Sequence, residues 1–509
     1  MHIRNKPTEA SVIVWVVLTV AILSLVAAEV LRVVTSKYQN ALHTSSWQES
    51  LLAAESGIDL AVLELRKSLY PANTAWDPAA GWNTTTSNGV TTRTLSLTPL
   101  NGTSMNVDIT VDDPPQLLDP SNGWKGYRVR TVGTLPLAGS ARADDNKQDT
   151  HLRKLSLSME RFTGNVLQTR SFATGEKPHV SRRTEAILRP LSAFDQAIMS
   201  VGTLDLTDQD IVIDSYDSRD PRKSYNGLYP AAPNDKNADG SVRWQQNGDI
   251  ATDGQILNAG NAHVYGDVST NSGTATGVAN VTGMQRNDFY QDPVPVSAPS
   301  WPSTNASITT VNGTTTIPAT STNGARSAYY DTTIAPTDAQ AAAASRYVLS
   351  GVILSGNQTL TISGNPDGSV SYVEIYITGD VTATGNAQVI LSPGVKAKIY
   401  FSGNFNIAGN GVVNSNNQPG DLLFYGINPP DNSSRSFQLG GNALLSAAVY
   451  APAYDVQINN GGTRGSVYGS FVGKSVKMNG VTDLHYDEAL GSGGSVNNFH
   501  IASWFEDNR

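Results

Sequence analysis

The stretch that decides the fold runs from Ser11 to Ala28 and reads SVIVWVVLTVAILSLVAA. It contains no charged residue, and at 1.5 Å per residue a helix of this length spans most of the roughly 30 Å apolar core of a bilayer. Residues 1–10, MHIRNKPTEA, form a short basic leader with Arg4 and Lys6. Because basic residues stay on the cytoplasmic side, the stretch predicts one membrane helix with the N-terminus inside and the rest of the chain exported.

The helical pattern does not end with the membrane segment. Apolar residues recur every three or four positions further along the chain, with charged residues elsewhere on the helical wheel. The repeating residues are Trp47, Leu51, Ala54, Ile58, Val62, Leu65 and Leu69. No proline interrupts residues 8–70, so we expect one continuous transmembrane and amphipathic helix over residues 11–70, about 90 Å long. A cleaved signal peptide, the alternative, would not continue in this way.

Composition limits what the rest of the chain forms and binds. Of 509 residues only 16% are charged, whereas 45 are Gly and 25 are Pro, a balance that favours short strands and turns. The formal net charge of −9 and the lack of a Lys/Arg cluster argue against nucleic acid as a partner. The absence of cysteine excludes disulfides and thiolate metal sites.

Residues 71–190 predict a small α+β head. Runs that suit strands alternate there with turn-rich stretches such as WNTTTSNG. The runs are TRTLSLTPL, MNVDITV, GYRVRTVGTL and RKLSLSMERF. Their alternation of apolar and polar residues places one face of an antiparallel sheet inward, where it would cover the apolar stripe of the helix.

Residues 191–500 predict a second and larger β body. Three segments that begin VILSG, EIYITG and KIYFSG align with Gly356, Gly379 and Gly403 spaced by 23 and 24 residues. That spacing fits one coil of a β-solenoid, in which each coil buries its apolar residues against its neighbours. A β-sandwich or jelly roll is the alternative. The Thr/Ser/Pro-rich tract at about 292–337 predicts an insertion or linker within the body.

The N-terminal region resembles a known family. The basic leader, the apolar helix directly behind it and the segment AAESG at residues 53–57 are similar to PilX-type minor pilins of type IV pilus systems, over about the first 70 residues. This resemblance implies that a prepilin peptidase on the cytoplasmic face removes the leader between Ala10 and Ser11. It also implies that the helix packs with other pilins or pilus assembly proteins.

The C-terminal region resembles the β-helical domain often found behind PilX-like N-termini in bacterial surface proteins. The pieces that carry this resemblance are AAVYAPAYDVQINNGG, YGSFVGKSV and LHYDEAL. It implies that the body is a right-handed parallel β-helix, or solenoid, held outside the cytoplasm. It implies no catalytic role for these pieces.

A stretch rich in aspartate raises the alternative of an enzyme. Its acids are Asp205, Asp208, Asp210, Asp214, Asp217 and Asp220. Carbohydrate-active enzymes use carboxylates as acid and base, and glycoside hydrolysis needs two of them about 5–10 Å apart. The same acids, set among Ser, Thr and Gly, also suit turn capping, which is the interpretation that we adopt. His485, Asp487 and Glu488 suit capping as well.

Asp235, Asn237 and Asp239 match the first half of a calcium-binding loop, which places oxygen ligands at alternate positions before a glycine turn. The twelfth position of such a loop is Gln246 rather than Glu, which argues against an EF-hand. Two interpretations stay open at this point: a shorter calcium loop and a plain Asx-rich turn. Calcium is the only cofactor that the sequence suggests.

Together these features predict a structural, assembly or adhesive component of a type IV pilus-like system rather than an enzyme. The chain would be a single-pass protein of the bacterial inner membrane, N-terminus inside and C-terminus outside, with a periplasmic or cell-surface body. Its expected partners are other pilins or pilus assembly proteins, the lipid bilayer, and a surface or carbohydrate ligand. The alternatives are a membrane-tethered carbohydrate-active enzyme and an anchored surface protein unrelated to pili.

Overall fold

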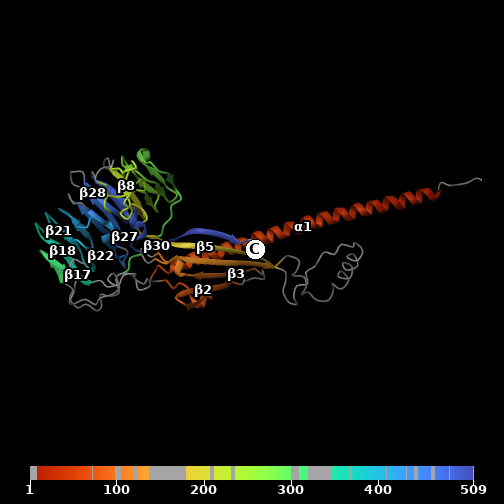
Figure 1. The fold of residues 1–509 in the computed structure, drawn as a ribbon, viewed down its shortest axis with the longest axis horizontal. Helices are drawn as coiled ribbons and strands as arrows, with labels where there is room; N and C mark the ends of the chain where they lie inside the picture. Colours follow the sequence, from red (N-terminus) through yellow and green to blue (C-terminus); the bar gives the residue numbers. More distant parts are fainter. Residues whose placement is uncertain are drawn as a thin grey trace, which may run out of the picture.

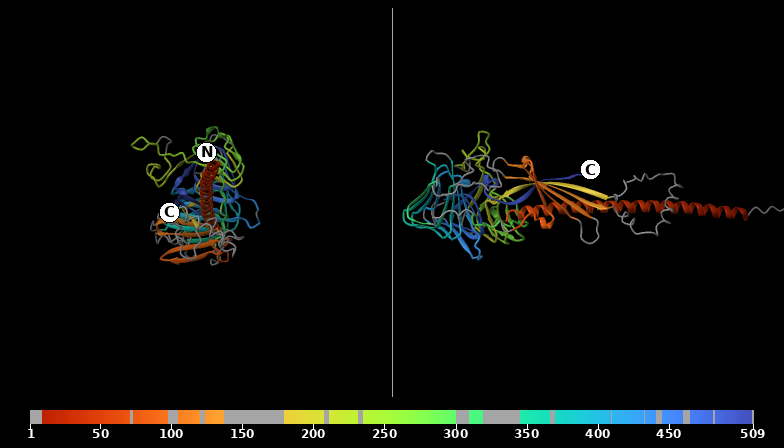
Figure 2. Two further views of the ribbon diagram at one scale, coloured as in Figure 1. Left: turned by 90° about the vertical axis from the view of Figure 1, so that its right-hand side faces the viewer. Right: turned by 90° about the horizontal axis from the view of Figure 1, so that it is seen from below.

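A rod, a head and a body follow one another along the longest axis of the computed structural model (Figure 1). The structure is mainly β, with one long N-terminal helix. Figure 2 shows this helix leaving the head at the end opposite to the body. The described residues are 9–70, 73–97, 105–119, 124–136, 179–206, 211–230, 235–299, 309–318, 345–365, 370–408, 410–431, 433–440, 445–459, 465–480 and 482–507.

Helix α1 (Glu9–Lys67) forms the rod and continues into the head without a break. The sequence placed this helix over residues 11–70. Its C-terminal end is held by the buried Glu64, whose carboxylate accepts a hydrogen bond from the backbone N–H of Trp76 at 2.9 Å and pairs with Lys67 at 2.6 Å. Basic residues in this last turn also favour the negative end of the helix dipole. The chain turns back here and enters the head sheet.

The head is a six-stranded antiparallel sheet in the order β1-β2-β3-β4-β5-β30. Its elements are β1 (Asn83–Ser87), β2 (Val90–Leu97), β3 (Asn106–Asp112), β4 (Tyr127–Pro136), β5 (His179–Ser192), β30 (Val496–Asp507), and the short helices η1 (Pro78–Ala80) and η2 (Pro115–Leu117). One face of the sheet covers the C-terminal half of α1, and Ile58, Ile109 and Leu188 are buried between them. The run of strand-like sequence at residues 153–162 lies outside the described residues.

Small residues let α1 approach β4 closely. A side chain at Gly133 of β4 would lie 2.2 Å from the carbonyl oxygen of Ser50, and one at Gly57 would lie 2.9 Å from Thr131. Two buried hydrogen bonds fasten this contact: Ser50 Oγ donates to the Gly133 carbonyl oxygen at 2.8 Å, and Thr131 Oγ1 donates to the Ala54 carbonyl oxygen at 2.7 Å. The small side chains of the AAESG segment are therefore explained by packing within this molecule.

The sixth head strand comes from the other end of the chain. β30 pairs with β5, so the chain leaves the head after β5, forms the whole body and returns to the head at β30. Phe499 of β30 is buried beside Tyr127 of β4, with ring centroids 5.5 Å apart. The sequence assigned residues 191–500 to the body, whereas β30 begins at Val496 and pairs in the head sheet. A local pattern of alternation shows that a strand exists but not which distant strand it pairs with.

The body consists of short strands and a few long ones, such as β27 and β28 with 15 residues each, between residues 198 and 487. Its first part contains β6 (Ile198–Ser200), β7 (Thr203–Asp205), β8 (Val212–Tyr216), β9 (Ile250–Thr252), β10 (Ile256–Asn258), β11 (His263–Val264), β12 (Val268–Thr270), β13 (Thr274–Thr276), η4 (Val278–Asn280) and β14 (Gln285–Arg286). Its second part contains β15 (Thr309–Asn312), β16 (Thr315–Pro318), β17 (Ser345–Leu354), β18 (Thr359–Ser363), β19 (Ser371–Ile377), β20 (Val381–Ala383), β21 (Gln388–Leu391), β22 (Val395–Phe401), β23 (Phe405–Ile407), β24 (Val412–Asn414), η6 (Pro419–Asp421), β25 (Leu422–Gly426), β26 (Arg435–Gly440), β27 (Leu445–Asn459), β28 (Gly465–Asn479) and β29 (Thr482–Asp487), and η7 (Glu488–Ser492) follows it.

Parallel pairing arranges these strands in rows around one apolar core. One row runs β17-β19-β22-β25-β27-β28-β6-β9-β12-β14. A second row runs β15-β17-β20-β23-β26-β27-β28-β7-β10-β13. Inward side chains of neighbouring strands meet in the core, as Phe405 and Phe437 do with ring centroids 4.8 Å apart.

The body is not the right-handed parallel β-helix, or solenoid, that the sequence predicts. In a solenoid each repeat contacts only its neighbours along the chain. Here β28 and β29, at the end of the body, pair with β6, β7 and β8, at its beginning. The parallel strands close into a barrel around the shared core instead of following the order of the chain.

The glycine spacing led to the wrong prediction of a solenoid. The spacing depends on the length of a strand and its turn, and it does not indicate which strands lie side by side. Gly403 does lie against Gly379, since a side chain added to Gly403 would come within 2.4 Å of the Gly379 backbone. Gly356, however, lies against Gly385 rather than Gly379. Contacts between distant segments, such as β28 with β6, leave no periodic signal at all.

The Thr/Ser/Pro-rich tract at about 292–337 contains strands as well as a connection. Residues 309–318 include β15 and β16, which pair in parallel with β17 and β18. Residues 292–299 cross between the body and the head, where the backbone N–H of Val294 donates to Oδ1 of Asn497 at 2.7 Å. The rest of the tract lies outside the described residues.

Replacing Phe499 tests whether β30 completes the head core. Phe499→Ala should lower the free energy of unfolding by about 3–5 kcal/mol, because it leaves a cavity beside Tyr127. The matched control Phe505→Ala, on the same strand but 58% exposed, should change it by less than about 0.5 kcal/mol. Urea unfolding of the detergent-solubilised protein measures both values. Equal effects of the two substitutions would contradict the place of β30 in the head.

Candidate functional site

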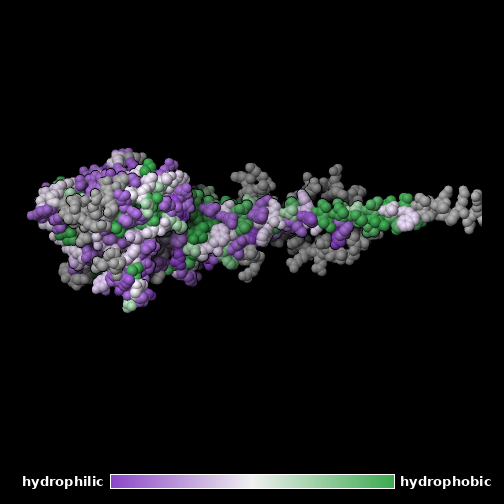
Figure 3. All heavy atoms as spheres, turned by 90° about the horizontal axis from the view of Figure 1, so that it is seen from above, coloured by the Kyte–Doolittle hydropathy of each residue, from purple (hydrophilic) through white to green (hydrophobic). Residues whose placement is uncertain are grey.

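The N-terminal half of α1 exposes an apolar surface, with the charged residues Glu29 and Arg32 only near its outer end. Its large apolar side chains between Val14 and Val34 are 45–71% exposed, and Figure 3 shows them as the green part of the rod. By length and composition this helix suffices to cross a membrane, and it is the one such helix in the part of the chain that the structure describes. A signal sequence can have the same length and composition, but α1 continues past this surface into the head.

The predicted cleavage site lies at the start of this helix. Ala10 and Ser11 follow Glu9, the first residue of α1. Their side chains lie outside the described part of the chain. The bond between them therefore precedes the exposed apolar surface, as the resemblance to minor pilins implies, and its cleavage stays a prediction.

Arg182 links α1 to the head strands β5 and β30 through a cation–π contact and an ion pair. The guanidinium carbon of Arg182, at the start of β5, lies 3.5 Å from the centre of the Trp47 ring. Arg182 also pairs with Glu506 of β30, and its side chain is 3% exposed. One buried cation thus joins the rod, β5 and β30. No local sequence pattern predicts this contact, because its three members lie in widely separated segments.

The residues of the predicted calcium loop lie close together but already have partners. Asp239 pairs with Arg222 at 2.5 Å, and Asp235 pairs with Arg243 at 3.7 Å. The side-chain amide of Asn237 donates to the carbonyl oxygen of Arg222 at 2.9 Å. A calcium ion at this loop would have to displace two arginine side chains, so calcium binding stays a prediction.

The described acids of the Asp-rich stretch do not form one cluster. Asp205 pairs with Lys477 at 3.8 Å, and Asp217 pairs with Arg219 at 3.0 Å. Asp220 accepts a hydrogen bond from the backbone two residues further on, at 2.8 Å. Among the described residues no three His, Asp or Glu side chains are grouped to hold a metal ion. Asp208 and Asp210 lie outside the described residues.

Asp214 differs from these acids because it belongs to a buried network. Its Oδ1 lies 2.6 Å from Nδ1 of His485, and its Oδ2 accepts a hydrogen bond from the Tyr229 hydroxyl at 2.6 Å. The Tyr229 ring stacks on the imidazole with centroids 3.7 Å apart. Burial, followed by the charge of Asp214, raises the pKa of Tyr229 above its ordinary value. The tyrosine therefore stays protonated and donates to the carboxylate.

This network fastens the two ends of the body to each other. Asp214 lies on β8 and His485 on β29, and the two strands pair in parallel. The sequence suggested capping for this region, and Asp487 does cap η7 by accepting a hydrogen bond from the backbone of Ala489 at 3.1 Å. His485 instead faces Asp214, 271 residues away. No local sequence signal reports that contact, because the register of β8 on β29 creates it.

Removing the Tyr229 hydroxyl tests whether the network is structural. Tyr229→Phe should lower the free energy of unfolding by about 1.5–3 kcal/mol, because a buried carboxylate loses a hydrogen bond. The control Tyr290→Phe removes a hydroxyl from a side chain that is 65% exposed, and should change stability by less than about 0.5 kcal/mol. Thermal and urea unfolding measure both. A Tyr229→Phe protein as stable as the control would show that the network adds nothing to the fold.

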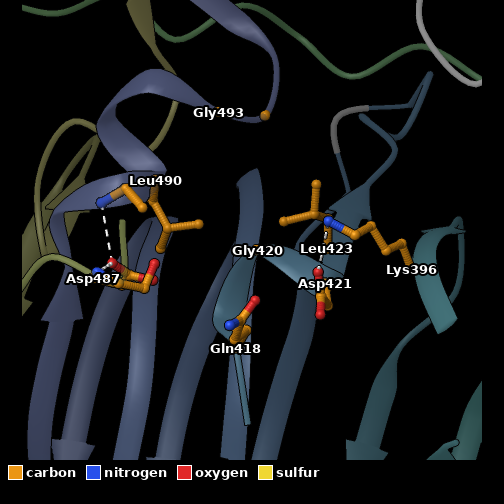
Figure 4. A pocket seen from close by; sticks show the side chains of 11 residues that line it. Lys396, Gln418, Gly420, Asp421, Leu423, Asp487, Leu490 and Gly493 are labelled. Carbon is orange, nitrogen blue, oxygen red and sulfur yellow. Dashed lines mark hydrogen bonds and ion pairs between the residues drawn. The ribbon is translucent and has the colours of Figure 1, made fainter. Parts of the chain in front are cut away.

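A cavity of about 180 Å³ lies beside η6 and η7 (Figure 4). Asp421 lines it and pairs with Lys396 at 3.2 Å, and Asp487 lines it while accepting a hydrogen bond from the backbone N–H of Ser218 at 3.0 Å. Burial raises the pKa of both carboxyl groups. Ligand pockets typically enclose about 300–1,000 Å³. This cavity therefore suits a few water molecules better than a substrate.

Tyrosine hydroxyls link the body to the head. The hydroxyl of Tyr450 lies 2.8 Å from both the Val294 carbonyl oxygen and Oδ1 of Asn497. Ser495 Oγ donates to the hydroxyl of Tyr425 at 3.3 Å. Burial raises the pKa of Tyr425 to about 12 and raises that of Tyr450 well above its ordinary value. The junction thus forms with both tyrosines neutral.

Alkaline pH should weaken the protein through these tyrosines. Tyrosine in the unfolded chain ionises near about pH 10, whereas the folded-state pKa of Tyr425 is raised to about 12. The stabilising effect is complete below the unfolded-state value and is lost as the pH rises through the folded-state value. We expect the free energy of unfolding in urea to fall above about pH 10, and to fall less steeply in Tyr425→Phe. Parallel pH curves for the two proteins would argue against this linkage.

Comparison with known proteins adds one family match and one structural likeness. Residues 391–492 match the family described as Domain of unknown function (DUF7305). No curated protein matches the sequence. The chain is similar to the crystal structure of the competence-associated pilin ComZ from Thermus thermophilus, with 13% identity over 91% of this chain and 97% of that chain, at a TM-score of 0.24. A likeness at this level carries no argument about fold or function.

Proposed function

We propose that the chain is a membrane-anchored structural component of a type IV pilus-like system that carries its body outside the cytoplasm. The observation that carries this proposal is the division of α1 into two halves. The N-terminal half is apolar and exposed, and the C-terminal half packs without a break into a six-stranded antiparallel sheet. An apolar surface of this length needs lipid or other apolar helices to cover it. A bilayer and a bundle of pilin helices both supply that cover.

Charges at the two ends of the apolar surface support a cytoplasmic N-terminus at the bacterial inner membrane. Arg4 and Lys6 precede it, and basic residues stay on the cytoplasmic side. At its other end Glu29 and Arg32 lie 3.8 Å apart on neighbouring turns. Charged side chains near a helix end reach the interface at lower cost than at the bilayer centre. The head and body then lie in the periplasm or on the cell surface.

The proposal includes processing and assembly of the PilX type. Removal of the leader between Ala10 and Ser11 would leave an N-terminus that begins with the apolar helix. The helix would then pack with other pilins or with pilus assembly proteins, while the body contacts a surface or carbohydrate ligand. The alternative is a surface protein that is anchored in the membrane but does not join a filament, and the experiments must distinguish the two.

A non-catalytic role is also part of the proposal. Asp214 and His485 form the kind of pair that enzymes use, but both are buried and the carboxylate is also bonded to Tyr229. A glycosidase needs two carboxyl groups open to a sugar, whereas Asp205 and Asp217 are each paired with a basic side chain. These contacts favour a structural role for the acids.

Paired aspartate substitutions on the two halves of α1 separate anchoring from folding. Val20→Asp with Leu23→Asp places two charges in the apolar half, each costing about 2.5–3.5 kcal/mol near the centre of a membrane helix. The control, Leu52→Asp with Leu63→Asp, changes two apolar residues of α1 that are also exposed but lie beside the head. We expect the first variant to move from the membrane fraction to the soluble fraction and the control to stay. Full membrane retention of both variants would contradict the anchor.

Filament association has its own test. In a strain that assembles pili, the sheared surface fraction should contain the protein with a mature N-terminus at Ser11, as read by mass spectrometry. In a matched strain without the pilus assembly machinery, protease accessibility of the body on intact cells should fall to background. Equal surface exposure in the two strains, or an intact Met1 in the sheared fraction, would remove the filament part of the proposal and leave only the anchor.

A further inference from the structure

One outward-facing line of side chains along the body is polar at six successive strands. It follows the second row of strands, from β20 through β23, β26, β27 and β28 to β7, and each of its residues pairs in register with the next. We call this line the amide ladder, and its members in order are Thr382, Asn406, Gln438, Gln457, Lys477 and Asp205. Because neighbouring strands lie about 4.8 Å apart, its five steps extend over about 24 Å.

The side chains next to the amide ladder in sequence explain why it faces outward. Each ladder residue follows an apolar residue on its strand, and those residues, among them Phe405, Phe437 and Val456, are buried in the core. Successive side chains of a strand point to opposite faces. Asn406 is accordingly exposed, and the other five ladder residues are partly exposed. Burial of one face therefore leaves the ladder residues on the outer face of the body.

The three central amides are free to bind a ligand. Asn406, Gln438 and Gln457 make no side-chain hydrogen bond with any residue that the structure describes. Each amide group carries one acceptor oxygen and two donor hydrogens. Three such groups at equal spacing form a repeating array of donors and acceptors that the protein itself does not use.

By contrast, polar side chains in the lines on either side of the amide ladder form hydrogen bonds with each other. On one side Ser475 Oγ donates to Asp455 at 2.6 Å. On the other side the amide of Asn479 donates to Oδ1 of Asn459 at 2.7 Å. Polar side chains beside the ladder thus bond to one another across neighbouring strands, whereas the three central amides make no such bond with a described residue.

The charge of the amide ladder limits what it binds. Its two charged members, Lys477 and Asp205, pair with each other at 3.8 Å, so the line carries no net charge. An anionic polymer would find no excess of cations there. The ladder also lacks apolar side chains that would dock a hydrophobic helix. What remains is a neutral, extended ligand with many hydroxyl groups.

We propose that the amide ladder binds a neutral polysaccharide whose chain lies along the body. Successive sugar residues of an extended chain repeat at a distance comparable to the spacing of the strands, so one hydroxyl-bearing residue meets each amide. The inference rests on the proposed function, in which the body lies outside the cytoplasm and meets such polymers there. It assigns the surface or carbohydrate contact of the body to named side chains.

The test is cosedimentation of the full-length, detergent-solubilised protein with insoluble cellulose and chitin, and with alginate beads as the acidic comparison. Asn406→Ala, Gln438→Ala and Gln457→Ala are combined in one variant. The matched control combines Gln246→Ala, Gln285→Ala and Asn287→Ala, which remove three exposed polar side chains that lie off the ladder. Far-ultraviolet circular dichroism confirms that both variants are folded. The single variant Gln438→Ala, measured in the same binding assay, should weaken binding less than the triple variant.

We expect binding to cellulose or chitin by the unaltered protein and the control, and roughly 10- to 100-fold weaker binding by the ladder variant, as three lost hydrogen bonds imply. Binding to neither neutral polysaccharide, equal binding by the ladder variant, or binding to alginate alone would each overturn the inference. The assay uses no membrane, so its failure leaves the anchor intact, and failure of the aspartate test on α1 leaves this result intact.

Discussion

The packing of α1 against β4 is the contact on which the rest of the molecule depends, because one continuous helix must satisfy two surroundings. Its first half presents apolar side chains to whatever surrounds the rod, and its second half is buried by the head sheet. The second half of α1 must approach the head sheet closely. Gly133 and Gly57 allow this, since any larger side chain there would strike the backbone of α1 or a neighbouring strand. The hydrogen bonds from Ser50 and Thr131 then hold the helix at that distance.

The head in turn determines how the body is carried. The body lies between β5 and β30, two neighbouring strands of one sheet, so the chain is attached to the head at both ends of the body. Further bonds reinforce this attachment: Tyr70, just beyond α1, donates to Asp292 at 2.8 Å, and Tyr450 lies 2.8 Å from Asn497. A body held in this way projects along the axis of the rod (Figure 2). That arrangement suits a component that presents its body away from a membrane or filament.

Polar residues of the body divide into those that stabilise it and those that are left free. Asp214, His485 and Tyr229 are buried and bonded to one another, and the partners lie at opposite ends of the body in sequence. Of the other described acids that suggested an enzyme, Asp205 and Asp217 pair with basic side chains, and Asp220 caps a turn. The amide ladder is different, because its central side chains have no partner within the described protein. Carboxyl groups that suggested catalysis in the sequence thus make contacts that stabilise the fold, whereas the unpaired amides lie on a surface that no sequence motif indicated.

The sequence by itself determined the features that depend on neighbouring residues. An uncharged apolar run, a continued helical repeat and alternating strands are local patterns, so the rod, the mainly β composition and most head strands could be read from them. The tertiary structure alone decided which strands pair: β30 with β5, β28 with β6, and β8 with β29. Those pairs join segments with no shared pattern, and their cause is burial of a common core, which no short window of sequence contains. The prediction of a solenoid was wrong for that reason. The contact of Asp214 with His485 could not be predicted from the sequence for the same reason.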